Sequence, residues 1–84
     1  MKKIIHFTAD WCAPCKKLKP IIEEFIANNQ DVEYVLVDVD IDFHRAEEYN
    51  VMSVPTLIIF KDKELINRHT GIADYQKIEQ LVNG

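Results

Sequence analysis

The pattern of apolar and polar positions divides the chain into strand-like and helix-like segments. Lys3 to Thr8 is apolar on both faces, as in a central strand that is covered on both sides. Val32 to Val39 alternates and is rich in valine, and Thr56 to Phe60 is a continuous apolar run, so both predict strands. Leu65 to Thr70 includes asparagine, arginine and histidine, which protect an open sheet edge and therefore predict an edge strand.

Helices are expected between and after these strands. The first runs from Ala13 to residue 28 or 29, with a kink at Pro20 because proline deletes a hydrogen bond and crowds the preceding turn. A short helix is expected from its cap at residue 42 to about Tyr49, with Asn50 as the C′ residue. Asp74 is placed to cap a last helix whose apolar face packs on the sheet.

The elements therefore follow one another in the order β-α-β-α-β-β-α. The first strand, helix and strand predict a right-handed crossover with two parallel strands. We expect a single α/β domain spanning residues 1–84, because 84 residues suffice for one modest core.

Composition and charge narrow the function classes. The net charge of −4 argues against nucleic acid as a partner, because phosphate binding needs a basic face. No apolar run approaches the roughly 18 residues of a membrane span. The start Met1-Lys2-Lys3 is like that of a signal peptide, but the apolar run behind it is short and ends at Asp10, so we expect no export. These observations predict a cytoplasmic monomer without a membrane partner.

The only two cysteines, Cys12 and Cys15, are separated by two residues and lie where the first strand leads into the first helix. In a reducing compartment such a pair is more often redox-active or metal-binding than structural. Zinc requires four ligands, and the pair supplies two. His6, His44 and His69 lie on separate elements without ligand spacing, so we expect no metal site.

The stretch Trp11 to Lys16, the helical Pro20, the segment Val54-Pro55-Thr56 and Gly71 before the last helix together resemble the thioredoxin family over nearly the whole chain. The resemblance implies a minimal thioredoxin fold, a four-stranded mixed sheet flanked by three helices. It implies that strands one and two are parallel and that the last two are antiparallel to them. It also implies a cis bond before Pro55, packed against the cysteines.

The chain departs from the family pattern in three places. It lacks the usual N-terminal strand and helix, which makes it similar to glutaredoxins in size. Ala13 stands where thioredoxins most often have glycine. His6 stands where the family has a buried acid that takes the proton of the resolving cysteine. A histidine with a pKa nearer neutrality could serve there, and the alternative is a buried, hydrogen-bonded histidine that fills volume.

The chemistry assigned to the pair follows from its place at the start of a helix. The unpaired N–H groups and the helix dipole there favour a thiolate at Cys12, so Cys12 is expected to attack and Cys15 to resolve the mixed disulfide. An apolar rim for the substrate is expected from Trp11, Pro14, Val54 and Ile72, although Ile72 could instead pack in the core.

The sequence therefore predicts a protein-disulfide reductase that cycles between a Cys12–Cys15 disulfide and a dithiol. No cofactor is expected to be bound; by resemblance, electrons come from NADPH through a separate thioredoxin reductase. The first alternative is a glutathione-linked, glutaredoxin-like carrier, although residues 71–74 lack the glycine pair which that family uses near glutathione. The second is a binding subunit in which the thiols are dispensable, and the third is a metal carrier.

Overall fold

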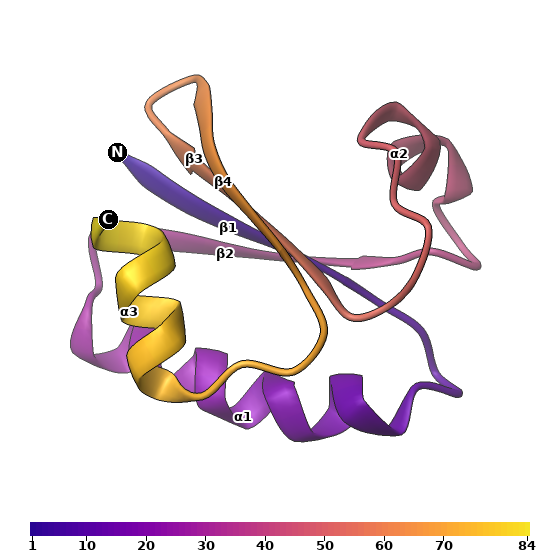
Figure 1. The fold of residues 1–84 in the computed structure, drawn as a ribbon, viewed down its shortest axis with the longest axis horizontal. Helices are drawn as coiled ribbons and strands as arrows, with labels where there is room; N and C mark the ends of the chain where they lie inside the picture. The colour runs from indigo at the N-terminus through magenta and orange to yellow at the C-terminus, as the bar shows by residue number, and fades with distance from the viewer.

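The computed structural model describes residues 1–84 and has the predicted order of elements (Figure 1). Each boundary lies within a residue or two of its expected position. The elements are β1 (Lys2–Thr8), α1 (Ala13–Asn28), β2 (Val32–Asp38), α2 (Phe43–Glu48), β3 (Thr56–Lys61), β4 (Glu64–Thr70) and α3 (Tyr75–Asn83).

The four strands form one mixed sheet in the order β2-β1-β3-β4. β1 is parallel to β2 and antiparallel to β3, and β3 is antiparallel to β4. The expectation that both last strands oppose the first two is therefore wrong for β4. Because β3 already runs against β1 and a tight hairpin reverses the chain again, β4 runs in the same direction as β1.

The β3–β4 hairpin turns without a glycine. Asp62 takes the left-handed conformation at φ 60°, which aspartate tolerates better than most residues. Its carboxylate also accepts a hydrogen bond from the N-terminal amine of Met1. Asn50, expected as the C′ residue of α2, likewise has a positive φ of 54° directly after the C-cap Tyr49.

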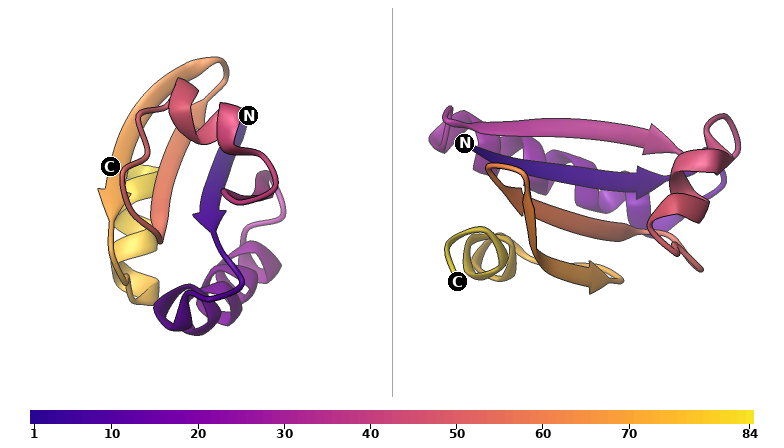
Figure 2. Two further views of the ribbon diagram at one scale, coloured as in Figure 1. Left: turned by 90° about the vertical axis from the view of Figure 1, so that its right-hand side faces the viewer. Right: turned by 90° about the horizontal axis from the view of Figure 1, so that it is seen from above.

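Helices cover both faces of the sheet (Figures 1 and 2). α1 and α3 pack on one face, where Ile4 and Leu57 contribute to the larger core cluster with Phe25 of α1. α2 packs on the other face, against a smaller cluster that includes Phe7 and Ile58. Side chains alternate along a strand, so His6 of β1 shares the α1 face with Ile4.

α1 continues unbroken through Pro20 to Asn28. Asp42 and Asp74 cap α2 and α3 as predicted, because their carboxylates accept from the backbone N–H groups of Arg45 and Lys77. No helix combines the length and the hydropathy needed to cross a lipid bilayer.

Candidate active site

The two cysteines form a disulfide at the N-terminus of α1, with an S–S distance of 2.18 Å. Cys12 is the N-cap residue, and its Sγ accepts a hydrogen bond from the backbone N–H of Cys15 at 3.2 Å. Cysteine thus occupies the position where serine or aspartate usually satisfies the free N–H groups of a helix. After reduction, that N–H group and the helix dipole stabilise negative charge on Cys12.

Exposure does not separate the roles of the two sulfurs in the disulfide form. Cys12 is 2% exposed and Cys15 is 1% exposed. Both belong to a small cluster with Ala9, against which Val39 and Val54 pack. The difference between the cysteines is the hydrogen bond to Cys12 Sγ, which favours that sulfur as the thiolate.

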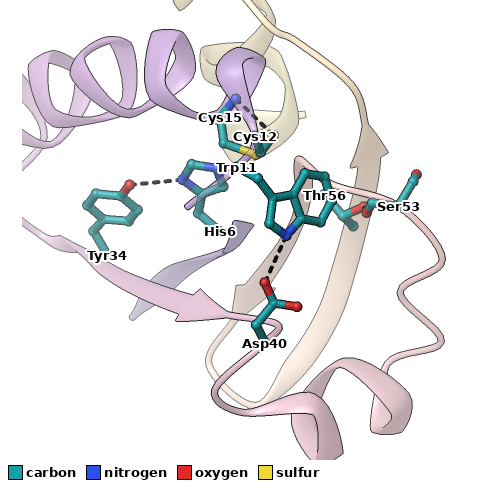
Figure 3. The surroundings of a disulfide bond; sticks show 8 residues. All are labelled: His6, Trp11, Cys12, Cys15, Tyr34, Asp40, Ser53 and Thr56. Atoms are coloured by element: carbon teal, nitrogen blue, oxygen red, sulfur yellow. Dashed lines mark hydrogen bonds between the residues drawn. A yellow bond between two sulfur atoms is a disulfide. The ribbon is translucent and has the colours of Figure 1, made fainter. Parts of the chain in front are cut away.

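The segment before β3 lies against this cluster. The Val54–Pro55 bond is cis, as the resemblance implied, and Pro55 is buried. Thr56 Oγ1 donates to the carbonyl oxygen of Ser53 at 2.7 Å and thereby closes the turn (Figure 3). The backbone N–H and C=O of Val54 make no hydrogen bond within the chain, so they are available to an extended peptide.

A pocket of about 140 Å³ opens beside the disulfide. It brings Trp11 and Val54 together, and it is completed by Val39, Val51, Met52 and Ser53. Trp11 is 69% exposed, and its indole N–H donates to Asp40 Oδ2 at 2.8 Å (Figure 3). This bond fixes an exposed apolar surface next to the cysteines.

The rest of the predicted rim is arranged differently. Pro14 is exposed in the first turn of α1, beside the cysteines in sequence. Ile72 is 53% exposed, so the alternative of core packing is wrong for it. Ile72 lines a separate, open pocket of about 420 Å³ together with Ile21, His69, Ala73, Asp74 and Lys77. The structure therefore joins Trp11 and Val54 in one pocket and leaves Ile72 in another.

His6 is completely buried on the α1 face of the sheet. Its Nδ1 is 3.0 Å from the hydroxyl of Tyr34 in β2, and its Nε2 has no hydrogen-bond partner. Desolvation, followed by the charge of Lys19, lowers the pKa of His6 from 6.5 to about 4. This pKa does not lie nearer neutrality, as the first of the two alternatives for His6 requires, and the imidazole is neutral at pH 7.

Sequence analysis missed two residues of this site, Tyr34 and Asp40. Tyr34 lies two positions before Leu36, the β2 residue that pairs with His6, so the parallel register is the signal that could have found it. Asp38 caps the loop that follows β2, because its Oδ1 accepts from the backbone N–H of Asp40. The Asp40 side chain instead holds Trp11. No group of three or more histidine, cysteine or acidic side chains is arranged to hold a metal ion.

Comparison with known proteins gives a consistent result. The family model described as Thioredoxin matches residues 1–84. A thioredoxin of Chlamydia trachomatis is 40% identical over 80 residues, covering 95% of this chain and 78% of that protein. One from Bacillus subtilis is 38% identical over 81 residues, with the same coverage. The oxidised mitochondrial thioredoxin 3 of Saccharomyces cerevisiae superposes with a TM-score of 0.89 at 35% identity, covering 98% of this chain and 76% of that one.

Proposed function

This chain belongs to the thioredoxin family and is a thiol–disulfide oxidoreductase that reduces protein disulfides, and we propose that Cys12 is its attacking thiolate and Cys15 its resolving thiol. The observation that carries the assignment is the hydrogen bond from the Cys15 N–H group to Cys12 Sγ at the helix N-terminus. This donor and the helix dipole lower the free energy of a thiolate at Cys12.

The reaction proceeds in two exchange steps. The Cys12 thiolate attacks one sulfur of the substrate disulfide, the second substrate sulfur leaves as a thiolate, and a mixed disulfide forms. Cys15 then loses its proton and attacks Cys12 Sγ, which releases the other substrate sulfur. The protein pair is oxidised by two electrons and the substrate disulfide is reduced by two. Because Cys15 attacks as an intramolecular neighbour, the second step is fast.

The substrate is proposed to lie across Trp11, Pro14 and Val54 in an extended conformation. The free backbone groups of Val54 pair with its main chain, and the pocket between Trp11 and Val54 receives an apolar side chain next to its cysteine. Pro55 supports this segment from the buried side, and Ile72 extends the apolar surface beyond the disulfide. Such a surface suits protein substrates of varied sequence, since main-chain bonds do not depend on side chains.

Electrons are proposed to come from NADPH through a separate thioredoxin reductase, with no cofactor held by this chain. We place the protein in the cytoplasm as a monomer, with residues 1–84 folding as a single domain. The compartment follows from a reactive cysteine pair that must be kept reduced. No observation favours the glutathione-linked carrier or the binding subunit over the reductase.

Insulin-disulfide reduction tests the proposal. One tube contains NADPH and thioredoxin reductase, and a second contains NADPH, glutathione and glutathione reductase. We expect insulin precipitation and NADPH oxidation in the first tube, and neither with the Cys12→Ser/Cys15→Ser double variant. Turnover only in the second tube would replace the proposed donor by glutathione. Full activity of the double variant would overturn the reductase.

A further inference from the structure

A buried nitrogen without a partner lies on the sheet side of the disulfide. His6 is 0% exposed, and its Nε2 makes no hydrogen bond. Figure 3 places the ring between the Tyr34 hydroxyl and the two cysteines, with this second nitrogen toward the sulfurs. Leaving a buried polar atom without a partner destabilises the folded protein, so its retention beside a reactive bond requires an explanation.

Tyr34 decides which ring nitrogen carries the proton. The tautomer of a neutral imidazole is set by the hydrogen bond that the other nitrogen makes. A phenol is a stronger acid than a neutral imidazole N–H group, and an imidazole nitrogen is a stronger base than a phenol oxygen. The Tyr34 hydroxyl therefore donates to His6 Nδ1 across their 3.0 Å separation. The proton of the ring then resides on Nε2, on the side of the disulfide.

Neither His6 nor Tyr34 changes its protonation state near neutral pH. Burial and then the charge of Lys19 lower the pKa of His6 to about 4, so the ring stays neutral. Burial and then the charge of Glu23 raise the pKa of Tyr34 to about 12, so the hydroxyl keeps its proton. A ring of such low basicity is a poor acceptor for a thiol proton but a good fixed donor.

We propose that His6 Nε2–H donates a hydrogen bond to the sulfur of Cys15 in the dithiol and mixed-disulfide states, with Tyr34 as the positioning residue that fixes the donor tautomer. The proposal rests on the proposed function, since it concerns the same resolving step. In the disulfide form neither sulfur accepts from this nitrogen. Breaking the S–S bond frees Cys15 Sγ to rotate and gives it a thiol or thiolate, both better acceptors.

Two consequences follow for the reaction. In the resolving step the Cys15 proton leaves to solvent, His6 stabilises the thiolate without receiving that proton, and the thiolate attacks Cys12 Sγ as the substrate sulfur departs. At equilibrium the donor is satisfied in the reduced protein and unsatisfied in the oxidised one. The pair His6–Tyr34 therefore shifts the dithiol–disulfide equilibrium toward the dithiol.

The test measures this equilibrium in glutathione redox buffers for the whole protein and four variants. His6→Leu removes the donor, and we expect the equilibrium to move toward the disulfide by about tenfold, or ~30 mV. His6→Gln keeps a side-chain N–H near the position of Nε2 and is expected to restore most of that shift. Tyr34→Phe leaves the ring in place but frees its tautomer, and is expected to move the equilibrium by about threefold. Tyr75→Phe is the matched control, because its hydroxyl bonds Asn28 far from the cysteines.

Nitrogen-15 NMR spectra of the imidazole report its tautomer, which would not change if His6 and Tyr34 had only a structural role. We expect the Nε2–H tautomer in both redox states of the wild-type protein, with its proton shifted downfield only after reduction, and mixed tautomers in Tyr34→Phe. Should His6→Leu fail to fold, Tyr34→Phe alone carries the test, since Tyr34 is only half-buried. An Nδ1–H tautomer, an imidazolium in the reduced protein at pH 7, or an unshifted equilibrium would overturn the proposal. Insulin reduction by the wild-type protein separates this failure from failure of the proposed function.

Discussion

The outer and inner sides of the disulfide differ in the groups that surround the sulfurs. On the outer side, Cys12 Sγ receives a backbone N–H group at the start of α1, and an exposed tryptophan and Val54 flank it. On the inner side lies the sheet, where a buried histidine is held by a tyrosine from the neighbouring strand (Figure 3). The two thiols are chemically identical, so any difference between their roles must come from their surroundings.

The comparison shows which kind of feature supports which step. The outer side depends on backbone geometry, which any helix start with a cysteine N-cap supplies, and on the proposed substrate surface. The inner side depends on two side chains whose distance is set by strand pairing. Changes on the outer side should alter substrate attack and binding, whereas changes on the inner side should alter stability, equilibrium and resolution.

The largest effect is expected from separating the two sulfurs. Cys12→Ser removes the proposed attacking thiolate and should form no mixed disulfide with insulin. Cys15→Ser should form the mixed disulfide but fail to resolve it, so multiple turnover falls by roughly 10³-fold or more with the loss of the intramolecular nucleophile. Mass spectrometry of the protein after reaction measures the adduct. Adducts on Cys15 in the Cys12→Ser variant, at the rate seen in the reverse variant, would contradict the assignment.

The next largest effect concerns the inner side and pH. The pKa of His6 is lowered from 6.5 to about 4 in the folded protein, so between these values the unfolded chain binds a proton that the folded chain does not. Stability is therefore fully present above pH 6.5 and is lost as the pH falls toward 4, by roughly 3 kcal/mol.

Urea unfolding of the disulfide form at pH 7 and at pH 4.5 measures this loss. The matched control is His6→Gln, which does not titrate and keeps His44, His69 and the carboxylates, so their contributions cancel in the difference. An equal loss of stability in both proteins would show that His6 is not the group responsible.

Most of the fold could be predicted from the sequence because each helix and strand has its own local signal. The apolar run of β1 predicted a strand buried on both faces, and the aspartate caps predicted the starts of α2 and α3. The predicted direction of β4 was wrong, although the reversal of the chain at a tight hairpin determines that direction. Core packing was an alternative for Ile72 because this residue is apolar. Ile72 follows Gly71, whose φ of 103° redirects the backbone, and its side chain is exposed.

The site was predictable only as far as its residues are neighbours in sequence or match a known motif. Cys12 and Cys15 are near neighbours, and Pro55 came from the resemblance. Tyr34 and Asp40 lie 28 and 29 positions from the residues they bond, so their roles depend on register and on the path of a loop. The pKa of His6 depends on complete burial, which a strand position alone does not reveal.

A smaller effect is expected on the outer side, at the pocket. Trp11→Ala removes an exposed aromatic side chain that lines the pocket beside the disulfide, and KM for insulin should rise about tenfold with kcat nearly unchanged. Ile41→Ala is the matched control, since Ile41 is a large apolar residue, 81% exposed, that does not line the pocket. If both variants raise KM equally, general surface hydrophobicity rather than this pocket binds the substrate.

The smallest effect is expected from removing the hydrogen bond that positions the Trp11 indole on the outer side. Asp40 accepts from the indole N–H of Trp11 at 2.8 Å on the surface, where a solvent-exposed hydrogen bond contributes about 0.5–1 kcal/mol. Asp40→Ala should therefore raise KM only about two- to fivefold and increase the mobility of the indole, measured by its fluorescence anisotropy. Asp40→Asn keeps an oxygen acceptor and should restore both values. If Asp40→Asn behaves like Asp40→Ala, the carboxylate acts through its charge, and the outer side, like the inner one, is tuned by electrostatics as well as by geometry.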